Sequence, residues 1–168
     1  MEKQFQSTLQ SNYSLQAGEV SAQSPSNIAL VKYWGKKKNQ IPTNSSISYT
    51  LTHSFTTTNL QFKPKEEKGF DVNVFLEGEY KESFAPKIIT FFERIGDYIP
   101  FLEQYSFEVH TSNSFPHSSG IASSASGMSA MALCLVQIEQ QLGAHLSEDE
   151  ALKKASFLAR LGSGSACR

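Results

Sequence analysis

Cysteine is scarce in this sequence, and long apolar runs are missing. The 168 residues include two cysteines, Cys134 and Cys167, which have no metal-binding spacing and are too few for a disulfide scaffold. A reducing cytoplasm is therefore the expected setting. Residues 1–20 are polar and lack the apolar core of a signal peptide or a membrane span. We interpret them as a polar N-terminal extension, and we expect no membrane partner.

An excess of charge of one sign is also missing. The chain has 15 basic and 16 acidic residues, which gives a formal net charge of -1. Proteins that bind nucleic acids or acidic membranes usually carry a broad basic surface, so we expect neither partner here. Any anionic ligand must be bound by a local group of residues.

The length allows one sizeable hydrophobic core, so residues 21–168 are predicted to form one domain or one lobe of a larger protein. Apolar alternation and turn residues predict strands at residues 27–34, 45–53, 56–63, 71–76 and 106–110. Helices are predicted at residues 86–96, 123–142 and 147–162. This order indicates an α+β fold with helices packed on a largely antiparallel sheet.

A polar segment, residues 111–125, joins a predicted strand to the longest predicted helix. It carries six serines, and the start of a helix presents free backbone N–H groups and the positive end of the helix dipole. Gly120 lets the backbone approach a ligand closely, and Ala122 and Ala125 keep that approach uncrowded. The segment therefore suits an anion such as a triphosphate.

Other interpretations of this segment stay open. The Gly-Lys-Ser/Thr ending of a Walker loop is missing, and a serine-rich connection with a capped helix has the same composition. Ser123 and Ser124 are poor candidates for a hydrolase nucleophile, because no Gly-x-Ser-x-Gly elbow surrounds them. His117 is either a surface residue or a functional one.

Two lysines, Lys32 and Lys36, lie four residues apart at the end of an apolar run. A charge inside a strand is costly, so Lys32 needs an acidic or polar partner or a bound anion. An ordinary salt bridge, with Tyr33 and Trp34 as core or rim aromatics, is the alternative.

Four segments in this order resemble the mevalonate diphosphate decarboxylases, also called diphosphomevalonate decarboxylases, of the GHMP kinase superfamily. They are SPSNIALVKYWGK (24–36), PTNSSIS (42–48), FPHSSGIASSA (115–125) and RLGSGSACR (160–168). The first and last are the most specific, whereas the third has a form shared by GHMP small-molecule kinases. The resemblance covers residues 24–168.

The resemblance implies a two-lobed α+β enzyme whose N-terminal GHMP lobe is similar to ribosomal protein S5 domain 2. This chain then holds that lobe and lacks the C-terminal lobe. The implied reaction is ATP-dependent phosphorylation of the 3-hydroxyl of mevalonate 5-diphosphate. Loss of that phosphate with carbon dioxide then gives isopentenyl diphosphate for isoprenoid biosynthesis. ATP and Mg2+ are the implied cofactors, and a homodimer is the implied state of the intact enzyme.

The resemblance also assigns roles to individual residues. ATP contacts are implied for Asn113, Gly120, Ser123 and Ser124. Substrate contacts are implied for Tyr33, Lys36, Ser163, Gly164, Ser165 and Arg168. Lys32 is expected to neutralise charge near the transferred phosphoryl group, and the Arg168 guanidinium to hold the substrate carboxylate. No residue is assigned to metal.

The sequence departs from the family in two respects. His117, Ser118 and Ser119 replace residues that are usually small and uncharged. The family's aspartate that activates the 3-hydroxyl is expected beyond residue 168, because Asp71, Asp97 and Asp149 stand in ordinary turn or helix contexts.

Three alternative functions stay open: a decarboxylase acting on mevalonate 5-phosphate, a mevalonate-type small-molecule kinase, and a non-catalytic nucleotide-binding fragment. The final Arg168 is also what a trypsin-like protease would leave. Nicking in the Gly-Ser loop, with the C-terminal half kept as a separate chain, and a deliberately shortened product are both expectations at this point.

Overall fold

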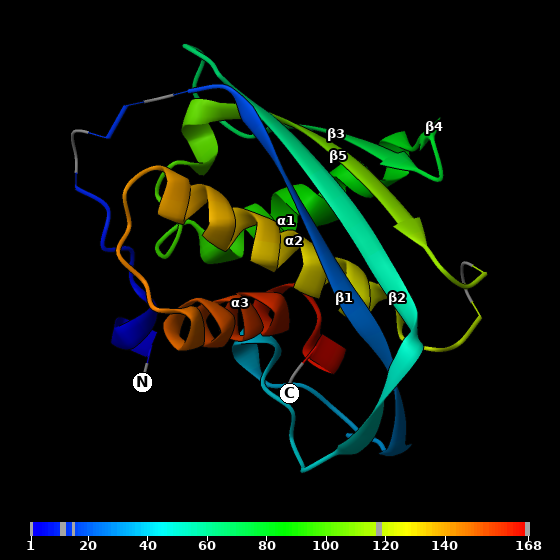
Figure 1. The fold of residues 1–168 in the computed structure, drawn as a ribbon. Coiled ribbons are helices and arrows are strands. Elements are labelled where there is room, and N and C mark those ends of the chain that lie inside the picture. The colour runs from blue at the N-terminus through cyan, green and yellow to red at the C-terminus, as the bar shows by residue number, and fades with distance from the viewer. Residues whose placement is uncertain (1, 11–12, 15, 117–118, 167–168) are drawn as a thin grey trace.

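The computed structural model describes residues 2–10, 13–14, 16–116 and 119–166. Its sheet has five strands in the order β1-β2-β5-β3-β4, shown in Figure 1. The strands are β1 (Gly18–Val31), β2 (Ile47–Pro64), β3 (Asp71–Leu76), β4 (Glu79–Tyr80) and β5 (Tyr105–Asn113). Neighbouring strands are antiparallel except β3 and β5, which are parallel.

Three helices cover one face of this sheet in Figure 1. They are α1 (Ala85–Ile95), α2 (Ser123–Gln141) and α3 (Glu148–Gly162). Short 3-10 turns are η1 (Glu2–Phe5), η2 (Lys38–Gln40), η3 (Glu82–Phe84), η4 (Leu102–Gln104) and η5 (Gly164–Ala166). The predicted α+β fold with a largely antiparallel sheet is confirmed.

The hydrophobic core lies between the sheet and the helices. Fully buried side chains come from both layers, including Leu60, Phe92, Phe107, Leu135 and Leu158. Burial of this apolar surface is the main favourable term in the folding free energy. Within the described part of the chain, no helix has the length and apolarity needed to cross a bilayer.

The first two strands differ from their prediction. Residues 45–53 and 56–63, predicted as two strands, belong to the single 18-residue strand β2. β1 begins at Gly18 and includes Ser24 and Ser26, which are buried although they are polar. The small hydroxyl side chains of Ser24 and Ser26 fit beneath the helix layer. Because these buried residues are polar, apolar alternation could not reveal this part of the strand.

One half of β2 is less buried than its alternation predicts. The strand predicted at residues 45–53 is present from Ile47 onward, but the burial of its apolar face is not, because Ile47 is 62% exposed and Tyr49 is 64% exposed. The reason is the sheet topology, because β5 pairs only with residues 56–64 of β2. The first half of β2 pairs with β1 alone.

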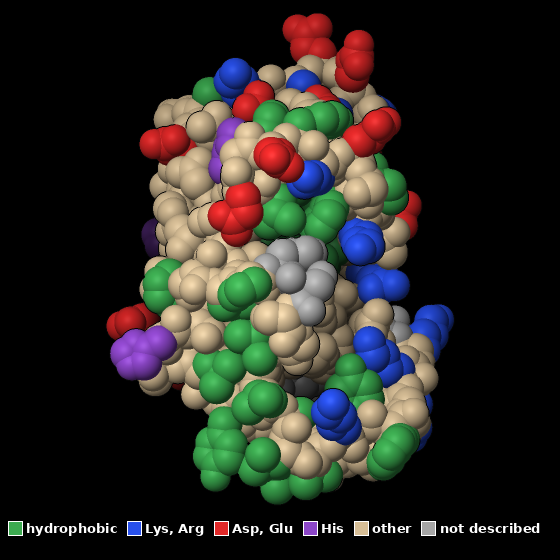
Figure 2. Space-filling view, turned by 90° about the vertical axis from the view of Figure 1, so that its right-hand side faces the viewer, with side chains coloured by type: hydrophobic (Ala, Val, Ile, Leu, Met, Phe, Trp, Pro, Cys, Tyr) green, Lys and Arg blue, Asp and Glu red, His purple; other side chains and the backbone are tan. Residues whose placement is uncertain are grey.

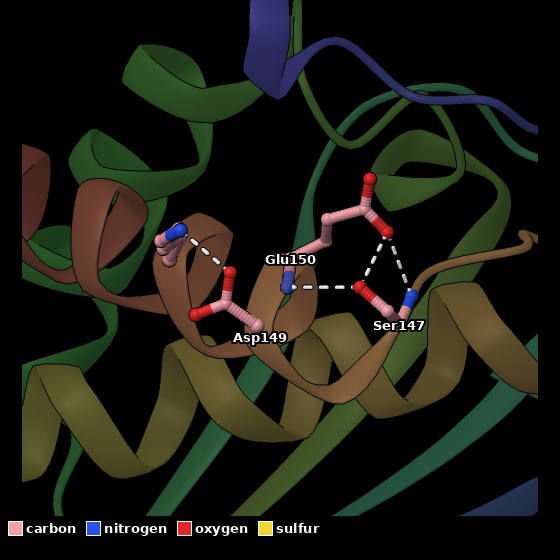
Figure 3. Close-up of polar contacts among 4 residues, drawn as sticks. Ser147, Asp149 and Glu150 are labelled. Carbon is pink, nitrogen blue, oxygen red and sulfur yellow. Dashed lines mark hydrogen bonds and ion pairs between the residues drawn. The ribbon is translucent and has the colours of Figure 1, made fainter.

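The helix predicted at residues 147–162 is α3, and it begins with a capping box, drawn in Figure 3. The Ser147 hydroxyl accepts the Glu150 backbone N–H at 3.3 Å, and the Ser147 backbone N–H donates to the Glu150 carboxylate at 2.8 Å. One turn later, a fully buried ion pair at 2.6 Å between Lys154 and Glu139 joins α3 to α2. Burial lowers the pKa of Lys154, and Glu139 opposes that shift.

The N-terminal segment contacts the core. Phe5 stacks on Phe157 with ring centroids 4.3 Å apart, and Leu9 and Tyr13 are partly buried against core residues. A segment expected to be a polar extension therefore adds apolar contacts to the end of α3.

Candidate functional site

The candidate site is built from four segments that are distant in the sequence. They are the end of β5, the start of α2, the η5 turn after α3, and the loop between β1 and β2. In Figure 1 the η2 turn of that loop lies beside α3, close to η5. Chain connectivity alone would not place these segments together.

Asn113 closes β5, and its side chain is held by a chain of hydroxyl groups. Thr56 Oγ1 donates to Asn113 Oδ1 at 2.7 Å. Thr56 Oγ1 also lies 2.7 Å from the Ser126 hydroxyl on α2. Ser126 also donates to the backbone oxygen of Ser123 at 3.2 Å. Because Asn113 Oδ1 accepts from Thr56, the Asn113 side chain presents its Nδ2 donor to a ligand.

Three of the four expected ATP residues share one cavity. Asn113, Ser123 and Ser124 line a cavity of about 280 Å³ whose depth is apolar, with Val74 and Met131 among its walls. Gly120 does not line it. A larger cavity of about 780 Å³ lies between the loop at residues 65–70 and the end of α1, and none of the predicted site residues lines it.

The start of α2 has no side-chain cap. The N-cap residue is Ala122, in a left-handed conformation with φ 53°, and no side chain accepts from the first turn. The serine-capped alternative is therefore wrong at this helix. The Ala125 N–H donates to the Ala122 backbone oxygen at 2.8 Å, so the N–H groups of Ser123 and Ser124 are the ones left for another acceptor. Gly120 also has a positive φ of 82°, with no atom within 4 Å of a Cβ added there.

Ala125 does not line the approach to the loop, contrary to expectation. It is fully buried in the core. The loop is instead fixed from the sheet side, because the Ser26 hydroxyl donates to the backbone oxygen of Ile121.

The expected substrate residues also come together. A Cβ added at Gly164 would lie 2.9 Å from Lys36 Cε and 3.0 Å from the Tyr33 hydroxyl. Lys36 Nζ lies 5.7 Å from the centroid of the Tyr33 ring. Glycine at position 164 therefore makes room for both side chains.

A chain of hydroxyl groups joins the two sets. Ser124 Oγ lies 3.4 Å from Ser163 Oγ, which lies 3.2 Å from Ser165 Oγ. Ser124 is an expected ATP residue, whereas Ser163 and Ser165 are expected substrate residues. The two proposed ligands would therefore meet across this contact.

Sequence reasoning gave no role to Asn27, which supports the η5 turn. Its Nδ2 donates to the Ser165 backbone oxygen at 3.3 Å and to the Ser48 hydroxyl at 3.0 Å. Its Oδ1 is buried and has no hydrogen-bond partner in the described part of the chain. Asn27 and Ser48 both lie in segments that resemble the family, 24–36 and 42–48, and this position was the only sequence signal that they could belong to the site.

Asn44 orders the loop between β1 and β2. Its Oδ1 accepts the Trp34 backbone N–H at 2.9 Å, and its Nδ2 donates to the Lys32 backbone oxygen at 3.3 Å. The Thr43 backbone N–H donates to the Gly35 oxygen at 3.0 Å. This small hairpin holds the segment that carries Tyr33 and Lys36.

Lys32 is not inside a strand. β1 ends at Val31 and Lys32 is exposed, so the argument from a costly buried charge is wrong. Within the described part of the chain, its side chain forms no hydrogen bond or ion pair with Lys36, Tyr33 or η5. Arg168 and His117 lie outside the described residues.

The lysines of this loop form no ion pair within the described part of the chain. Residues 20–65 contain no Asp or Glu. Among the described ion pairs, none involves Lys32, Lys36, Lys37 or Lys38. These cations are therefore available to an anionic ligand.

Comparison with known proteins was made for the whole chain. The family model described as "Diphosphomevalonate decarboxylase-like N-terminal domain" matches residues 24–168. Diphosphomevalonate decarboxylase of Debaryomyces hansenii is 35% identical over 159 residues, covering 88% of this chain and 39% of that protein. The Saccharomyces cerevisiae protein is 32% identical over 163 residues, covering 89% of this chain and 39% of its own length.

Solved structures agree. Mevalonate diphosphate decarboxylase from Staphylococcus aureus matches with a TM-score of 0.73 and 33% identity, over 90% of this chain and 43% of that one. The Enterococcus faecalis enzyme matches with a TM-score of 0.72 and 32% identity, over 91% and 45%. The chain spans about two fifths of the length of its relatives.

Proposed function

Because this chain belongs to the diphosphomevalonate decarboxylase-like family and matches the family's N-terminal domain, we propose an activity for the whole protein. It uses ATP to decarboxylate mevalonate 5-diphosphate to isopentenyl diphosphate, and this chain supplies the N-terminal half of the site. The observation that carries the proposal is the contact between Ser124 and Ser163, at 3.4 Å. It supports the proposal because residues proposed for the nucleotide would lie next to residues proposed for the substrate, as phosphoryl transfer between two bound ligands requires.

The nucleotide side suits ATP. The uncapped start of α2 offers N–H groups to the phosphates, and Ser123 and Ser124 add hydroxyls. The adjoining cavity of about 280 Å³ is apolar in its depth and polar at Asn113, which suits a nucleobase. A solved relative that is 32% identical is described as a complex with MVAPP, AMPPCP and magnesium.

Mg2+ fits this site only as a shared ion. Among the described residues, no three His, Cys, Asp or Glu side chains form a cluster that could hold a metal. Mg2+ commonly binds through phosphate oxygens, waters and one or two protein oxygens. The Ser123 and Ser124 hydroxyls are the oxygens that this chain offers beside the phosphates, and the ion would neutralise their charge there.

The substrate side suits a diphosphate. Lys36 and the Tyr33 hydroxyl lie against Gly164, and Ser163 and Ser165 place hydroxyls beside them. Lys32 stays a proposed source of charge neutralisation from the same loop. Arg168 stays a proposed carboxylate ligand, by a paired hydrogen bond from its guanidinium.

None of the three aspartates of this chain belongs to the four segments that form the site. Asp149 forms an ion pair with Lys153 at 2.5 Å on the surface of α3, Asp71 begins β3, and Asp97 follows α1. We propose that the activating carboxylate belongs to the C-terminal portion of the protein. The 168-residue chain alone then binds nucleotide weakly and does not turn over.

The test follows ADP and carbon dioxide when the complete protein is incubated with ATP, Mg2+ and each mevalonate phosphate. Both products from mevalonate 5-diphosphate are expected. ADP without carbon dioxide would instead make the protein a kinase, and preference for mevalonate 5-phosphate would change the substrate. Turnover by the purified 168-residue chain would contradict the assignment of the missing carboxylate.

A cytoplasmic location and a homodimer of the intact enzyme stay proposals. The buried thiol of Cys134 is compatible with a reducing setting, because burial raises its pKa to about 12 and keeps it unreactive. A separate C-terminal chain, left by nicking after Arg168, also stays a proposal.

A further inference from the structure

The pairing of β1 with β2 shifts between Pro25 and Ser26. Pro25 pairs with Phe55, whereas Ser26 pairs with Leu51, so the ladder is irregular here. Consecutive side chains of a regular strand point to opposite faces of the sheet, and an irregularity of this kind re-aims them. Ser26 and Asn27 are consecutive, yet they are 0% and 5% exposed. The irregularity accounts for the burial of two neighbouring polar side chains.

The Ser26 side chain reaches the loop that precedes α2. In Figure 1 α2 lies against β1 and β2. The Ser26 hydroxyl donates to the backbone oxygen of Ile121, the residue before the left-handed N-cap Ala122. Among the described hydrogen bonds, it is the only one from a side chain to residues 119–122. Asn27 donates instead to η5, so the two neighbours support different parts of the candidate site.

This hydrogen bond fixes the orientation of the peptide group between Ile121 and Ala122. The C=O and N–H of a trans peptide point in opposite directions, and the described residues include no cis peptide bond. Because the Ile121 oxygen points toward Ser26, the Ala122 N–H points away from it. That N–H has no acceptor in the described part of the chain. It adds a third free donor to those of Ser123 and Ser124, and successive free N–H groups of this kind suit an anion.

The observed orientation of this peptide is unfavourable for Ala122 itself. Ala122 has φ 53° and ψ 42°, in the left-handed region that residues with a Cβ disfavour. Rotation of the peptide would bring φ of Ala122 to a negative value. It would also turn the Ile121 oxygen to the side where the N–H now points, and an oxygen there would repel a phosphate. The bond from Ser26 opposes this rotation.

We propose that Ser26 is a positioning residue for the phosphates of the nucleotide. It holds the peptide between Ile121 and Ala122 with its N–H turned toward the ligand. Ser26 is fully buried, so it acts through the loop rather than by contact with a ligand. This role rests on the proposed nucleotide function, and it adds to that function a residue of β1 that lies 95 positions before the loop.

The first experiment measures ATP binding to the 168-residue chain by NMR. The backbone amide signals of Ala122, Ser123 and Ser124 are followed as ATP and Mg2+ are added. In the unsubstituted chain all three signals should shift. Ser26→Ala should remove the shift of Ala122 and weaken ATP binding by roughly tenfold, the effect of losing one hydrogen bond to a charged group.

A second substitution separates peptide orientation from stability. Glycine adopts a positive φ without the steric penalty of a Cβ, so Ala122→Gly removes the reason for the peptide to rotate. Combined with Ser26→Ala, it should restore most of the ATP affinity, measured well below the unfolding temperature. A role of Ser26 in stability alone predicts no such rescue, because glycine replaces none of the contacts that the hydroxyl made.

The matched control is Ser24, a second buried serine of β1. It is 4% exposed and forms no side-chain hydrogen bond with the loop in the described part of the chain. Ser24→Ala should leave ATP binding unchanged, and thermal unfolding should show that every variant folds. Equal loss of affinity in Ser24→Ala and Ser26→Ala, or no rescue by glycine, would overturn the proposal.

The orientation of the peptide can also be read without a ligand, from crystal structures of the unsubstituted chain and of Ser26→Ala. We expect φ of Ala122 to become negative in Ser26→Ala. A peptide that keeps its orientation there would contradict the role of Ser26 alone. Amide signals of the unsubstituted chain that do not respond to ATP would contradict the proposed nucleotide site, so the two failures are distinguishable.

Discussion

Thr56 is a buried hydroxyl with two partners, Asn113 and Ser126, and it lines the same cavity as Asn113. Thr56→Val keeps the shape and removes the hydroxyl, so the Asn113 amide loses its fixed orientation. We expect ATP to bind about tenfold more weakly, equivalent to about 1.4 kcal/mol. The free energy of unfolding should fall by about 1–3 kcal/mol, since a buried acceptor loses its donor.

The measurement for Thr56 is an NMR titration that follows the side-chain amide signals of Asn113 as ATP is added. In the unsubstituted chain these signals should shift. Thr56→Ser keeps the hydroxyl and should restore both the shift and the affinity. An unchanged Asn113 response in Thr56→Val would show that the hydroxyl serves stability alone.

Gly164 tests the substrate side of the site. Gly164→Ala places a methyl group 2.9 Å from Lys36 Cε, and the flexible end of that side chain must move. Folding stability should change by less than about 1 kcal/mol, whereas affinity for inorganic pyrophosphate should fall severalfold. Calorimetric titration with pyrophosphate gives both the affinity and the stoichiometry.

Gly96→Ala is the matched control for Gly164, because the nearest atom to its added Cβ is 3.6 Å away. It should leave pyrophosphate binding unchanged. Equal affinity in Gly164→Ala and the unsubstituted chain would mean that Lys36 does not hold the anion.

Single residues were predicted unevenly. Asn113, Ser123 and Ser124 were identified by resemblance, and the structure places them in one cavity. Thr56 was missed because it stands in a run of three threonines, which reads only as a strand former. Lys36 and Gly164 are far apart in the sequence, so no local pattern could show that they touch.

At the scale of elements, the start of α3 depends on pH. The Ser147 hydroxyl and backbone N–H donate to the Glu150 carboxylate and hold the pKa of Glu150 below its ordinary value. A lowered folded-state pKa stabilises the fold above the unfolded-state value, and that contribution is lost as pH falls through the folded-state pKa. Denaturant unfolding across the acid range should show this loss.

Two substitutions separate the parts of the capping box. Glu150→Gln keeps an acceptor for Ser147 but cannot titrate, so its stability should vary less with pH below the ordinary carboxyl range. Ser147→Ala should cost about 1 kcal/mol at neutral pH by leaving a first-turn N–H without a partner. A Glu150→Gln profile parallel to that of the unsubstituted chain would refute the assignment.

Helices were easier to predict than strands for a physical reason. The buried face of α2 and the capping box of α3 are local patterns that one helix imposes on its own sequence. Burial in β1 instead depends on what covers it: Ser24 and Ser26 are buried by the helix layer, whereas Ile28 and Leu30 are exposed. Along this strand, residue type therefore gives the wrong burial both for the polar residues, which are buried, and for the apolar ones, which are exposed.

At the scale of the whole molecule, the N-terminal segment fastens to the end of α3. Phe5 stacks on Phe157, which also meets Tyr98 edge to face at 4.9 Å. Phe5→Ala should lower the free energy of unfolding by about 1–2 kcal/mol, since a partly buried ring and its stacking are lost. Thermal and denaturant unfolding measure this, with the neighbouring exposed residue varied in Gln4→Ala as the control. If Phe5→Ala lowers the free energy of unfolding no more than Gln4→Ala does, the contact of Phe5 with Phe157 does not stabilise the fold.

The fold class was predictable at this scale, because strands followed by helices allow few architectures. The long polar strand β1 and the docked N-terminal segment were not, because each is stabilised by contacts with distant parts of the chain.

The stretch without Asp or Glu makes the charge uneven along this chain, although the net charge is only -1. Outside residues 20–65 the sequence carries nine basic and 16 acidic residues, and in Figure 2 most of the acidic side chains lie toward the upper end. An approaching phosphate is attracted toward the lysine loop and repelled from the opposite end, so encounters are oriented before contact. The attraction acts over about 8 Å at physiological ionic strength and shortens as salt is added.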